Sequence, residues 1–390
     1  MYTLDEVRPV WAEINLDNLA HNIMEVRKHI KEDALVTAVV KANAYGHGSI
    51  DMARTLLDNG VDRLAVAILG EAIELRKANI EDTILILGYI PPNQHEDVLK
   101  YDLISTIYNY EDAEKLSNKA VELGKRAIIH IKIDTGMSRI GFVANEETIE
   151  DILKISKLPN IYIEGIFTHF AKADELDKSH AKDQFQKYMG FIDKLENRGL
   201  NIEIKHISNS AGIIDLRDYN LNMVRAGIMI YGLYPSNEVN KKEIKLKPVM
   251  ALKAKISHLK TVPKGTGISY GHIFITEKES KIATIPIGYA DGFTRLLTDK
   301  AEVYIKGKRA KIVGKICMDQ CMADVTHIEN IELGDEVVIF GYEDGHPHVD
   351  ELASKIGTIN YEIVCMVSRR VPRIYISDGN IIKIKDYLLE

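Results

Sequence analysis

The chain has 390 residues, of which 46% are hydrophobic and 27% charged, and its formal net charge is −7. This length exceeds what one small core can organise, so we expect two domains. The negative charge argues against a surface that binds nucleic acid. No apolar run reaches the length of a membrane span, and residues 1–11 lack the apolar stretch of a signal peptide. These features predict a cytoplasmic protein without a membrane or nucleic-acid partner.

The three cysteines, Cys317, Cys321 and Cys365, are too few for a disulfide framework. Cys317 and Cys321 have no neighbouring Cys or His pair that would complete a zinc site. We therefore predict no metal site, and we expect both of these thiols to be reduced and buried.

From about residue 16 to residue 235, short runs of β-branched residues alternate with amphipathic helical stretches. The helical pattern covers residues 50–57, 71–77, 110–123 and 184–197. The strand pattern covers residues 35–40, 63–67, 84–87, 103–107, 127–133, 161–168, 204–208 and 223–226. Eight strands separated by helices predict an α/β fold, a (β/α)8 barrel over residues 1–240. A doubly wound open sheet is the alternative, but it usually has fewer strands, and no G-x-G-x-x-G follows Val40.

The pattern changes after Pro235. Residues 237–247 are polar and charged, so we expect a linker there. Short strand patterns follow at residues 250–258, 281–287, 302–305, 311–316 and 336–339, and only residues 349–356 look helical. Residues 241–390 are therefore predicted to form a C-terminal, mostly-β domain.

The first predicted strand ends directly at Lys41. An amine at the end of a core strand is costly unless it is neutralised, paired or covalently engaged. A lysine that simply marks where the strand reaches water is the simplest explanation. However, the loop that follows Lys41 contains Gly46 and Gly48 and precedes a helix, which favours a lysine that faces a cofactor.

The active site of a (β/α)8 barrel lies at the C-terminal ends of its strands. Besides Lys41, these ends carry Arg139, His169, Ser210 and Arg225. A cationic rim around a lysine suits an anionic carbonyl cofactor, and pyridoxal phosphate fits this description. The lysine would form the Schiff base, glycine N–H groups and hydroxyls would bind the phosphate, and an arginine would face the pyridine nitrogen.

Nine stretches of the chain, in the same order, resemble those of bacterial alanine racemases, which are pyridoxal-phosphate enzymes of fold type III. They are residues 39–48 (VVKANAYGHG), 134–141 (DTGMSRIG), 168–171 (THFA), 225–228 with 231–233 (RAGI, YGL), 269–271 (SYG), 287–292 (IGYADG), 316–320 (ICMDQ), 360–362 (NYE) and 370–373 (RVPR). The resemblance covers essentially the whole chain. It implies interconversion of L- and D-alanine, with D-alanine supplied to cell-wall peptidoglycan. A racemase for serine or for a broader set of amino acids stays an alternative.

The resemblance implies two catalytic bases, Lys41 and Tyr270. A tyrosine titrates near ~10 and needs help to act as a base at neutral pH. The family supplies this help through His169, which links to Arg225. Arg225 would also lie at the pyridine nitrogen, and because arginine keeps its proton, that nitrogen should stay unprotonated.

The resemblance also implies the binding groups. Besides Lys41 and Arg225, the cofactor would be held at its phosphate by Tyr45, Ser210, Tyr361 and the backbone of Gly227 and Ile228. The substrate carboxylate would be held by Arg139 and by the backbone N–H of Met318. Lys132 corresponds to a lysine that is carbamylated in many members and fixes Arg139, and a lysine paired with another carboxylate is the alternative. Asp174, Tyr289 and Arg295 resemble residues that line the entrance.

Two positions depart from the family pattern. Lys315 stands where arginine is usual, and Ser208 stands where a small apolar residue is common. The resemblance implies a homodimer in which Tyr270 and Met318 come from the partner chain. A barrel decarboxylase and a non-catalytic pyridoxal-phosphate carrier are further alternatives. The Tyr270 and Met318 motifs argue against the first, and the β domain with Tyr270 argues against the second.

Overall fold

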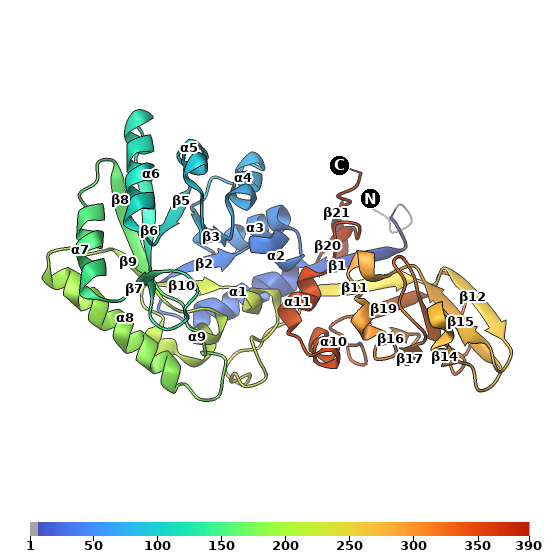
Figure 1. Cartoon of the computed structure of the whole chain (residues 1–390). Coiled ribbons are helices and arrows are strands. Elements are labelled where there is room, and N and C mark those ends of the chain that lie inside the picture. The colour runs from blue at the N-terminus through green and yellow to red at the C-terminus, as the bar shows by residue number, and fades with distance from the viewer. Residues whose placement is uncertain (1–6, 390) are drawn as a thin grey trace. The chain divides into compact units, whose positions relative to one another are not determined.

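A computed structural model describes residues 7–389 of the chain (Figure 1). The described residues divide into two compact units. The barrel unit comprises residues 20–44 and 49–246, and the β unit comprises residues 7–19, 45–48 and 247–389. Residues 1–6 of the stretch inspected for a signal peptide lie outside the described residues. Among residues 7–389, no helix combines the length and the apolar character needed to cross a membrane.

Eight parallel strands close into a ring in the barrel unit, in the order β2-β3-β4-β5-β6-β8-β9-β10, with β10 paired back to β2. The strands are β2 (Leu35–Val39), β3 (Arg63–Val66), β4 (Ile84–Ile86), β5 (Ile104–Ile107), β6 (Ala127–Asp134), β8 (Ile161–Phe167), β9 (Ile204–His206) and β10 (Met223–Ala226). A short strand, β7 (Phe142–Val143), pairs with the end of β6. This ring confirms the predicted (β/α)8 barrel.

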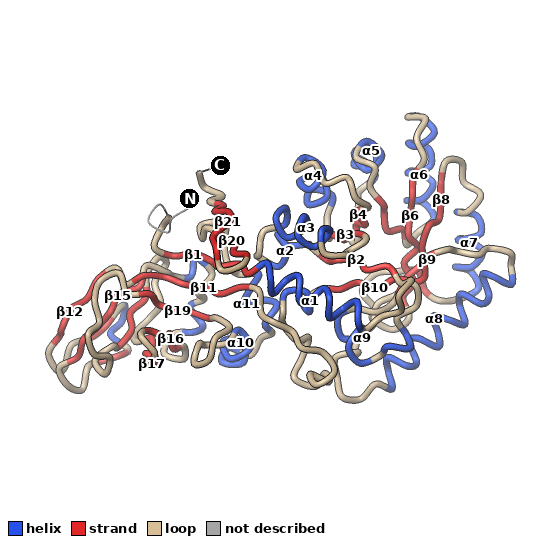
Figure 2. The backbone as a smooth tube through the Cα atoms, turned by 180° about the vertical axis from the view of Figure 1, so that it is seen from behind, coloured by secondary structure: helices blue, strands red, loops and turns tan. Residues whose placement is uncertain are grey.

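Helices follow the barrel strands, and α4 to α8 lie on the outer side of the ring (Figures 1 and 2). The helices are α1 (Leu16–Lys28), α3 (Ser49–Asp58), α4 (Leu69–Lys77), α5 (His95–Lys100), α6 (Tyr110–Glu122), α7 (Glu146–Ile155), α8 (Ser179–Asn197) and α9 (Ser210–Asp215). Strands β4 and β5 are buried along their whole length, as expected for parallel strands that helices cover on the outside.

The β unit contains a sheet of ten strands in the order β12-β15-β18-β17-β16-β19-β11-β1-β20-β21. The strands are β1 (Val10–Asn15), β11 (Met250–Lys255), β12 (His258–Val262), β15 (Ser280–Ile285), β16 (Glu302–Ile305), β17 (Lys308–Ile312), β18 (Cys321–Asp324), β19 (Glu336–Phe340), β20 (Arg373–Ser377) and β21 (Asn380–Lys385). The short strands β13 (Gly267–Ile268) and β14 (Phe274–Ile275) form a separate pair. The mostly-β second region is thereby confirmed.

Several details of the β unit differ from the prediction. Strand β1, to which the sequence analysis assigned no structure, lies between β11 and β20 in the sheet. The single strand expected at residues 250–258 is two strands, β11 and β12. Two helices are present instead of one, α10 (Val349–Ile356) and α11 (Asn360–Cys365).

The cysteine prediction was partly wrong. Cys321 is buried, but Cys317 is only partly buried, and Cys365 is exposed. All three are free thiols.

The predicted linker at residues 237–247 carries two buried apolar side chains, Val239 and Ile244, so this polar segment is packed against the protein rather than loose.

Candidate active site

The loop after β2 is a left-handed turn, α2 (Lys41–Tyr45). Residues 42–45 all have φ between +52° and +54°, which costs L-residues roughly 1–2 kcal/mol each. The carboxylate of Glu71, in the first turn of α4, accepts a hydrogen bond from the Ala42 N–H at 2.6 Å. The Ala44 N–H donates to the Val40 carbonyl at 2.9 Å. The backbone that carries Lys41 is therefore held by its surroundings in a strained conformation.

The mouth of the barrel gathers cationic groups, as the sequence predicted. Burial lowers the pKa of His169 well below its ordinary value, and the charges of Arg225, Arg139, Lys132 and Lys41 lower it further. These charges act on one imidazole from the ends of different strands. The structure therefore brings together five predicted barrel residues: three with predicted catalytic roles, the predicted carboxylate-binding arginine, and the lysine predicted to fix that arginine.

Arg225, the third residue of β10, is buried and makes four hydrogen bonds through its two Nη groups. Nη2 donates to His169 Nδ1 at 3.1 Å and to the carbonyls of Thr168 and Ile207 at 2.9 Å, and Nη1 donates to His206 Nδ1 at 2.7 Å. Burial lowers the pKa of Arg225 to about 10, so the guanidinium stays charged at neutral pH. Its Nε–H donates to no acceptor within residues 7–389, which leaves one donor for a ligand.

Gln184 positions the segment around His169, although sequence reasoning gave it no role. Its side chain, on α8, is almost fully buried. Gln184 Nε2 donates to the His169 carbonyl at 3.0 Å, and its Oε1 accepts from the Ala171 N–H at 2.9 Å. The only signal in the sequence was a glutamine at the helical spacing of the apolar residues Tyr188 and Phe191.

Lys132 lies buried on β6. Burial, together with the neighbouring charge of Arg225, lowers the pKa of Lys132 to about 7. Its Nζ donates to the carbonyl of Ile133 at 2.9 Å. The alternative prediction was a Lys132 paired with a carboxylate. Among the described residues, no carboxylate forms an ion pair with Lys132.

Arg139 lies in the loop after β6. Asp134 shapes this loop, because its Oδ1 accepts from the N–H groups of Gly136 at 2.8 Å and Met137 at 3.0 Å. Arg139 itself is exposed, and within the described chain it makes no hydrogen bond or ion pair. Its fork of donors is available to a carboxylate.

Ser210 begins α9, but Asn209 is the residue that caps this helix, by accepting from the Gly212 N–H at 3.0 Å. Ser210 Oγ instead accepts from the N–H groups of Gly227 at 3.0 Å and Met229 at 3.4 Å. The Gly227 N–H that was expected to face a phosphate is therefore engaged by Ser210. The next N–H, that of Ile228, donates to no acceptor within the described chain.

Four further predicted site residues, Tyr45, Tyr361, Tyr270 and Met318, belong to the β unit. The rings of Tyr45 and Tyr361 lie 6.1 Å apart between centroids, and burial raises the pKa of Tyr45. Tyr270, in a short turn, is 70% exposed, and Met318 is 53% exposed. The Met318 N–H donates to no acceptor among residues 7–389.

Tyr270, Tyr289 and Met318 lie on loops that are joined by hydrogen bonds, and we call these three residues the exposed loop group. The Ser269 hydroxyl donates to the Lys315 carbonyl at 2.6 Å. The N–H of Tyr289 donates to the Cys317 carbonyl, and that of Ala290 to the Met318 carbonyl, both at 3.1 Å. The exposed loop group therefore forms one exposed surface within the β unit.

The residues expected at the entrance lie in different units. Asp174 is in the barrel unit, where its carbonyl accepts from the Ser236 hydroxyl at 2.5 Å. Tyr289 and Arg295 are in the β unit, and Arg295 is exposed.

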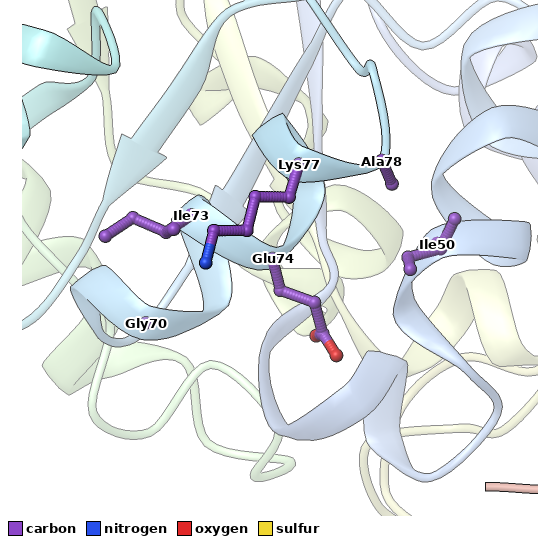
Figure 3. Close-up of a pocket in the computed structure, with 6 residues that line it drawn as sticks. All are labelled: Ile50, Gly70, Ile73, Glu74, Lys77 and Ala78. Atoms are coloured by element: carbon purple, nitrogen blue, oxygen red, sulfur yellow. The ribbon is translucent and has the colours of Figure 1, made fainter. Parts of the chain in front are cut away.

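The pocket in Figure 3 contains none of the predicted site residues, since it is lined by Ile50, Gly70, Ile73, Glu74, Lys77 and Ala78. Within residues 7–389, no three His, Cys, Asp or Glu side chains are grouped as metal ligands.

The fold and the barrel mouth define a (β/α)8 enzyme whose site is built to hold anionic ligands between cationic side chains. Residues 14–235 match the family "Alanine racemase, N-terminal domain", and residues 249–375 match "Alanine racemase, C-terminal domain". The chain belongs to the alanine racemase family, whose members are isomerases.

Individual relatives agree with this assignment. The alanine racemase of Clostridium tetani is 53% identical over 98% of this chain and 99% of its own, and that of Methanococcus maripaludis is 52% identical over 94% and 99%. The structure of an alanine racemase from Clostridium difficile has a TM-score of 0.95 at 48% identity, covering 98% of this chain and 99% of its own. A Bacillus anthracis alanine racemase with bound L-Ala-P has a TM-score of 0.92 at 37% identity, over 98% and 99%.

Proposed function

We propose that this protein is a pyridoxal-phosphate-dependent racemase that interconverts L- and D-alanine. The observation that carries the proposal is the buried Arg225, which is bonded to His169 and keeps one donor available at the mouth where Lys41 follows β2. Full-length likeness to alanine racemases from several organisms supports the same substrate. The D-alanine produced would supply peptidoglycan synthesis, and a cytoplasmic location stays a prediction.

The barrel residues fit pyridoxal phosphate. The Nε–H of Arg225 suits the ring nitrogen as acceptor, and because Arg225 keeps its proton, that nitrogen would stay unprotonated. The Ile228 N–H has no other acceptor in the described chain, and the Ser210 hydroxyl, whose oxygen already accepts two N–H groups, can donate to the phosphate. Lys41 would attach the cofactor, with Tyr45, Tyr361 and Gly227 completing the set. When bound, the cofactor withdraws electrons and thereby acidifies the Cα–H bond of the substrate.

Lys41 and Tyr270 would move the proton, one removing it from Cα and the other returning it to the opposite face. The hydrogen-bond direction at His169 supports the role of Tyr270. Because Arg225 can only donate, Nδ1 of a neutral His169 is an acceptor, and its proton must lie on Nε2. That Nε2–H could stabilise the phenolate form of Tyr270, which a tyrosine base needs.

The substrate carboxylate would be held by Arg139 and by the N–H of Met318. Lys132 would be carbamylated, because a pKa of about 7 leaves much of its amine neutral and nucleophilic. The modification would replace a cation that repels Arg139 by an anion that attracts it. Asp174, Tyr289 and Arg295 would line the entrance.

We further propose a homodimer in which Tyr270 and Met318 of each chain complete the site of the other. Their exposures of 70% and 53% within one chain support this arrangement, since a catalytic phenol works best when water is excluded. Large apolar side chains gathered on one exposed surface also favour an interface.

Racemisation of L-alanine, L-serine and L-lysine by the wild type, Lys41→Ala and Tyr270→Phe tests the proposal. We expect alanine to be the best substrate, Lys41→Ala to be inactive and Tyr270→Phe to lose most of its activity. Tyr89→Phe, at an exposed tyrosine of the barrel unit, is the matched control and should behave as the wild type. Faster turnover of serine would identify a serine racemase, release of carbon dioxide would identify a decarboxylase, and full activity of Tyr270→Phe in both directions would refute the two-base mechanism.

A further inference from the structure

A buried row of hydrogen bonds leads from Arg225 away from the barrel mouth, and we call it the histidine relay. Arg225 Nη1 donates to His206 Nδ1 at 2.7 Å, and His206 Nε2 lies 2.9 Å from His130 Nδ1. His130 Nε2 lies 2.8 Å from Glu164 Oε2, and the same oxygen accepts from Arg63 Nη1 at 2.5 Å. The roles proposed above for Lys41, His169 and Tyr270 were argued without the histidines and the glutamate of this row.

The two ends of the relay determine where its protons lie. Arginine can only donate, so His206 Nδ1 must accept and the proton of a neutral His206 must be on Nε2. At the other end, the ionised Glu164 can only accept, so His130 Nε2 must donate. The middle bond then has one possible direction, from His206 Nε2–H to His130 Nδ1. A second proton on either imidazole would place two donors face to face.

Burial and charge agree with this assignment. Both imidazoles are fully buried. Burial lowers the pKa of His206 and of His130, with Arg225 acting in the same direction on both, while Glu164 raises that of His130. The other charges that act on the pair, Lys132 on His206 and Arg63 on both, also lower their pKa values. Burial raises the pKa of Glu164, but its bonds to His130 and Arg63 lower it to about 2 overall, so it is an anion.

Packing holds the imidazole rings of His206 and His130 in position. Phe167 stacks on His206, with centroids 4.5 Å apart and planes 10° apart, and meets His130 edge-on. Gly165 leaves room for the His130 ring, because a Cβ there would lie 2.5 Å from its Nδ1. Position 165 of β8 therefore accommodates only glycine beside the His130 ring.

We propose that His206, His130 and Glu164 are positioning residues that connect the anion of Glu164 to the guanidinium of Arg225. The relay orients Arg225 so that Nη2 reaches His169 and Nε faces the ligand, and it supplies a remote counter-charge to a buried cation that has no carboxylate of its own among the described residues. The inference rests on the proposed function only in naming the ligand as the pyridoxal-phosphate ring. It predicts that a change at Glu164 is felt at the barrel mouth.

Glu164→Gln tests this, because the amide removes the charge and can donate to His130, so that the proton of His130 is no longer fixed on Nε2. In the enzyme loaded with cofactor, we expect kcat/KM for alanine to fall about tenfold, a fraction of what a positioned acid–base group supplies. We expect cofactor affinity, measured by fluorescence titration, to fall with it. Glu164→Asp keeps the charge and should stay within about threefold of the wild type. Asp62→Asn is the matched control, since Asp62 precedes Arg63 but bonds to Arg27 and Val36.

Nitrogen NMR of the histidine side chains gives a second readout that a purely structural role would not move. In the wild type, His206 and His130 should each show a protonated Nε2 and an unprotonated Nδ1, and Glu164→Gln should disturb this pattern. Gly165→Ala tests the same relay without a charge change and should also lower cofactor affinity. The opposite tautomers in the wild type, or unchanged kinetics and affinity in both variants, would overturn the inference. A wild type that binds the cofactor but does not racemise alanine would instead refute the proposed function alone.

Discussion

The barrel unit buries two of its proposed site cations, whereas the β unit exposes two of its proposed site residues. In the barrel unit, Arg225 and Lys132 are each only 3% exposed and lie within a network of buried bonds. In the β unit, Tyr270 is 70% exposed and Met318 53%. The barrel unit therefore orients these two buried cations by itself, whereas the exposed loop group would need another surface to exclude water.

This difference has an energetic consequence. A buried site group is also part of the fold, so its removal should change both the free energy of unfolding and the activity. An exposed site group contributes little to folding, so its removal should change activity alone. Substitutions that change one of these quantities without the other therefore test whether burial distinguishes the two groups of residues.

Arg225→Ala should have the largest effect, because it acts on both quantities. The carbonyls of Thr168 and Ile207 and the acceptor of His206 would lose their donor in a buried place, which should lower the free energy of unfolding by roughly 2–4 kcal/mol. Racemase activity should fall on the order of 10³-fold or more, since His169 also loses its orientation. Urea unfolding and a coupled D-alanine assay measure the two effects. Arg139→Ala, at an exposed arginine, should lose activity at unchanged stability, and an equal loss of stability would contradict the comparison.

Tyr270→Phe should affect activity alone. Removing the hydroxyl of a proposed base should lower kcat on the order of 10²- to 10³-fold, while the free energy of unfolding should change by less than about 0.5 kcal/mol, because the side chain is exposed. Thermal unfolding at low protein concentration, together with initial rates in both directions, provides the measurement. A large loss of stability would show that Tyr270 is part of the fold of its own chain.

Lys132→Met should remove a pH dependence of stability. The folded pKa of Lys132 is lowered to about 7 from an ordinary value of 10.5, so between these values the unfolded chain binds more protons at this site. Unmodified Lys132 therefore makes the free energy of unfolding rise from pH 7 to pH 10, at about 1.4 kcal/mol per pH unit at most. Urea unfolding of both forms across this range gives the difference. If the difference does not vary with pH, Lys132 is already modified, and ¹³C NMR of the folded enzyme in ¹³C-bicarbonate would show the carbamate.

Much of this barrel could be predicted from the sequence. Continuous β-branched runs marked all eight strands, and the rule that sites lie at strand ends led to Lys41, His169 and Arg225. The left-handed turn after Lys41 could not be predicted, because nothing in an Ala-Asn-Ala sequence requires positive φ. Strand β1 could not be predicted either, since its pairing with β20 joins residues more than 350 positions apart and leaves no local pattern.

The histidine relay was missed for a different reason. His130, Glu164 and His206 lie within strands, where each reads singly as a satisfied core residue. The available signal was alternation, because His130, Lys132 and Asp134 follow one another at a spacing of two on β6 and so share a face. Only the closed ring shows that this face meets His206 of β9 and Arg225 of β10.

Ser208→Ala should have the smallest effect, and it tests whether burial alone gives a polar group a role. Ser208 is fully buried, yet the only hydrogen bond of its side chain within the described residues, from Oγ to the Tyr219 carbonyl, is long at 3.3 Å. Because the family usually has a small apolar residue here, we expect the free energy of unfolding to change by about 1 kcal/mol or less, with racemase activity unchanged. Urea unfolding and steady-state kinetics beside the wild type provide the measurement. A several-fold loss of activity would mean that Ser208 orients the neighbouring Asn209 and Ser210, and the distinction between buried groups inside and outside the network of Arg225 would no longer hold.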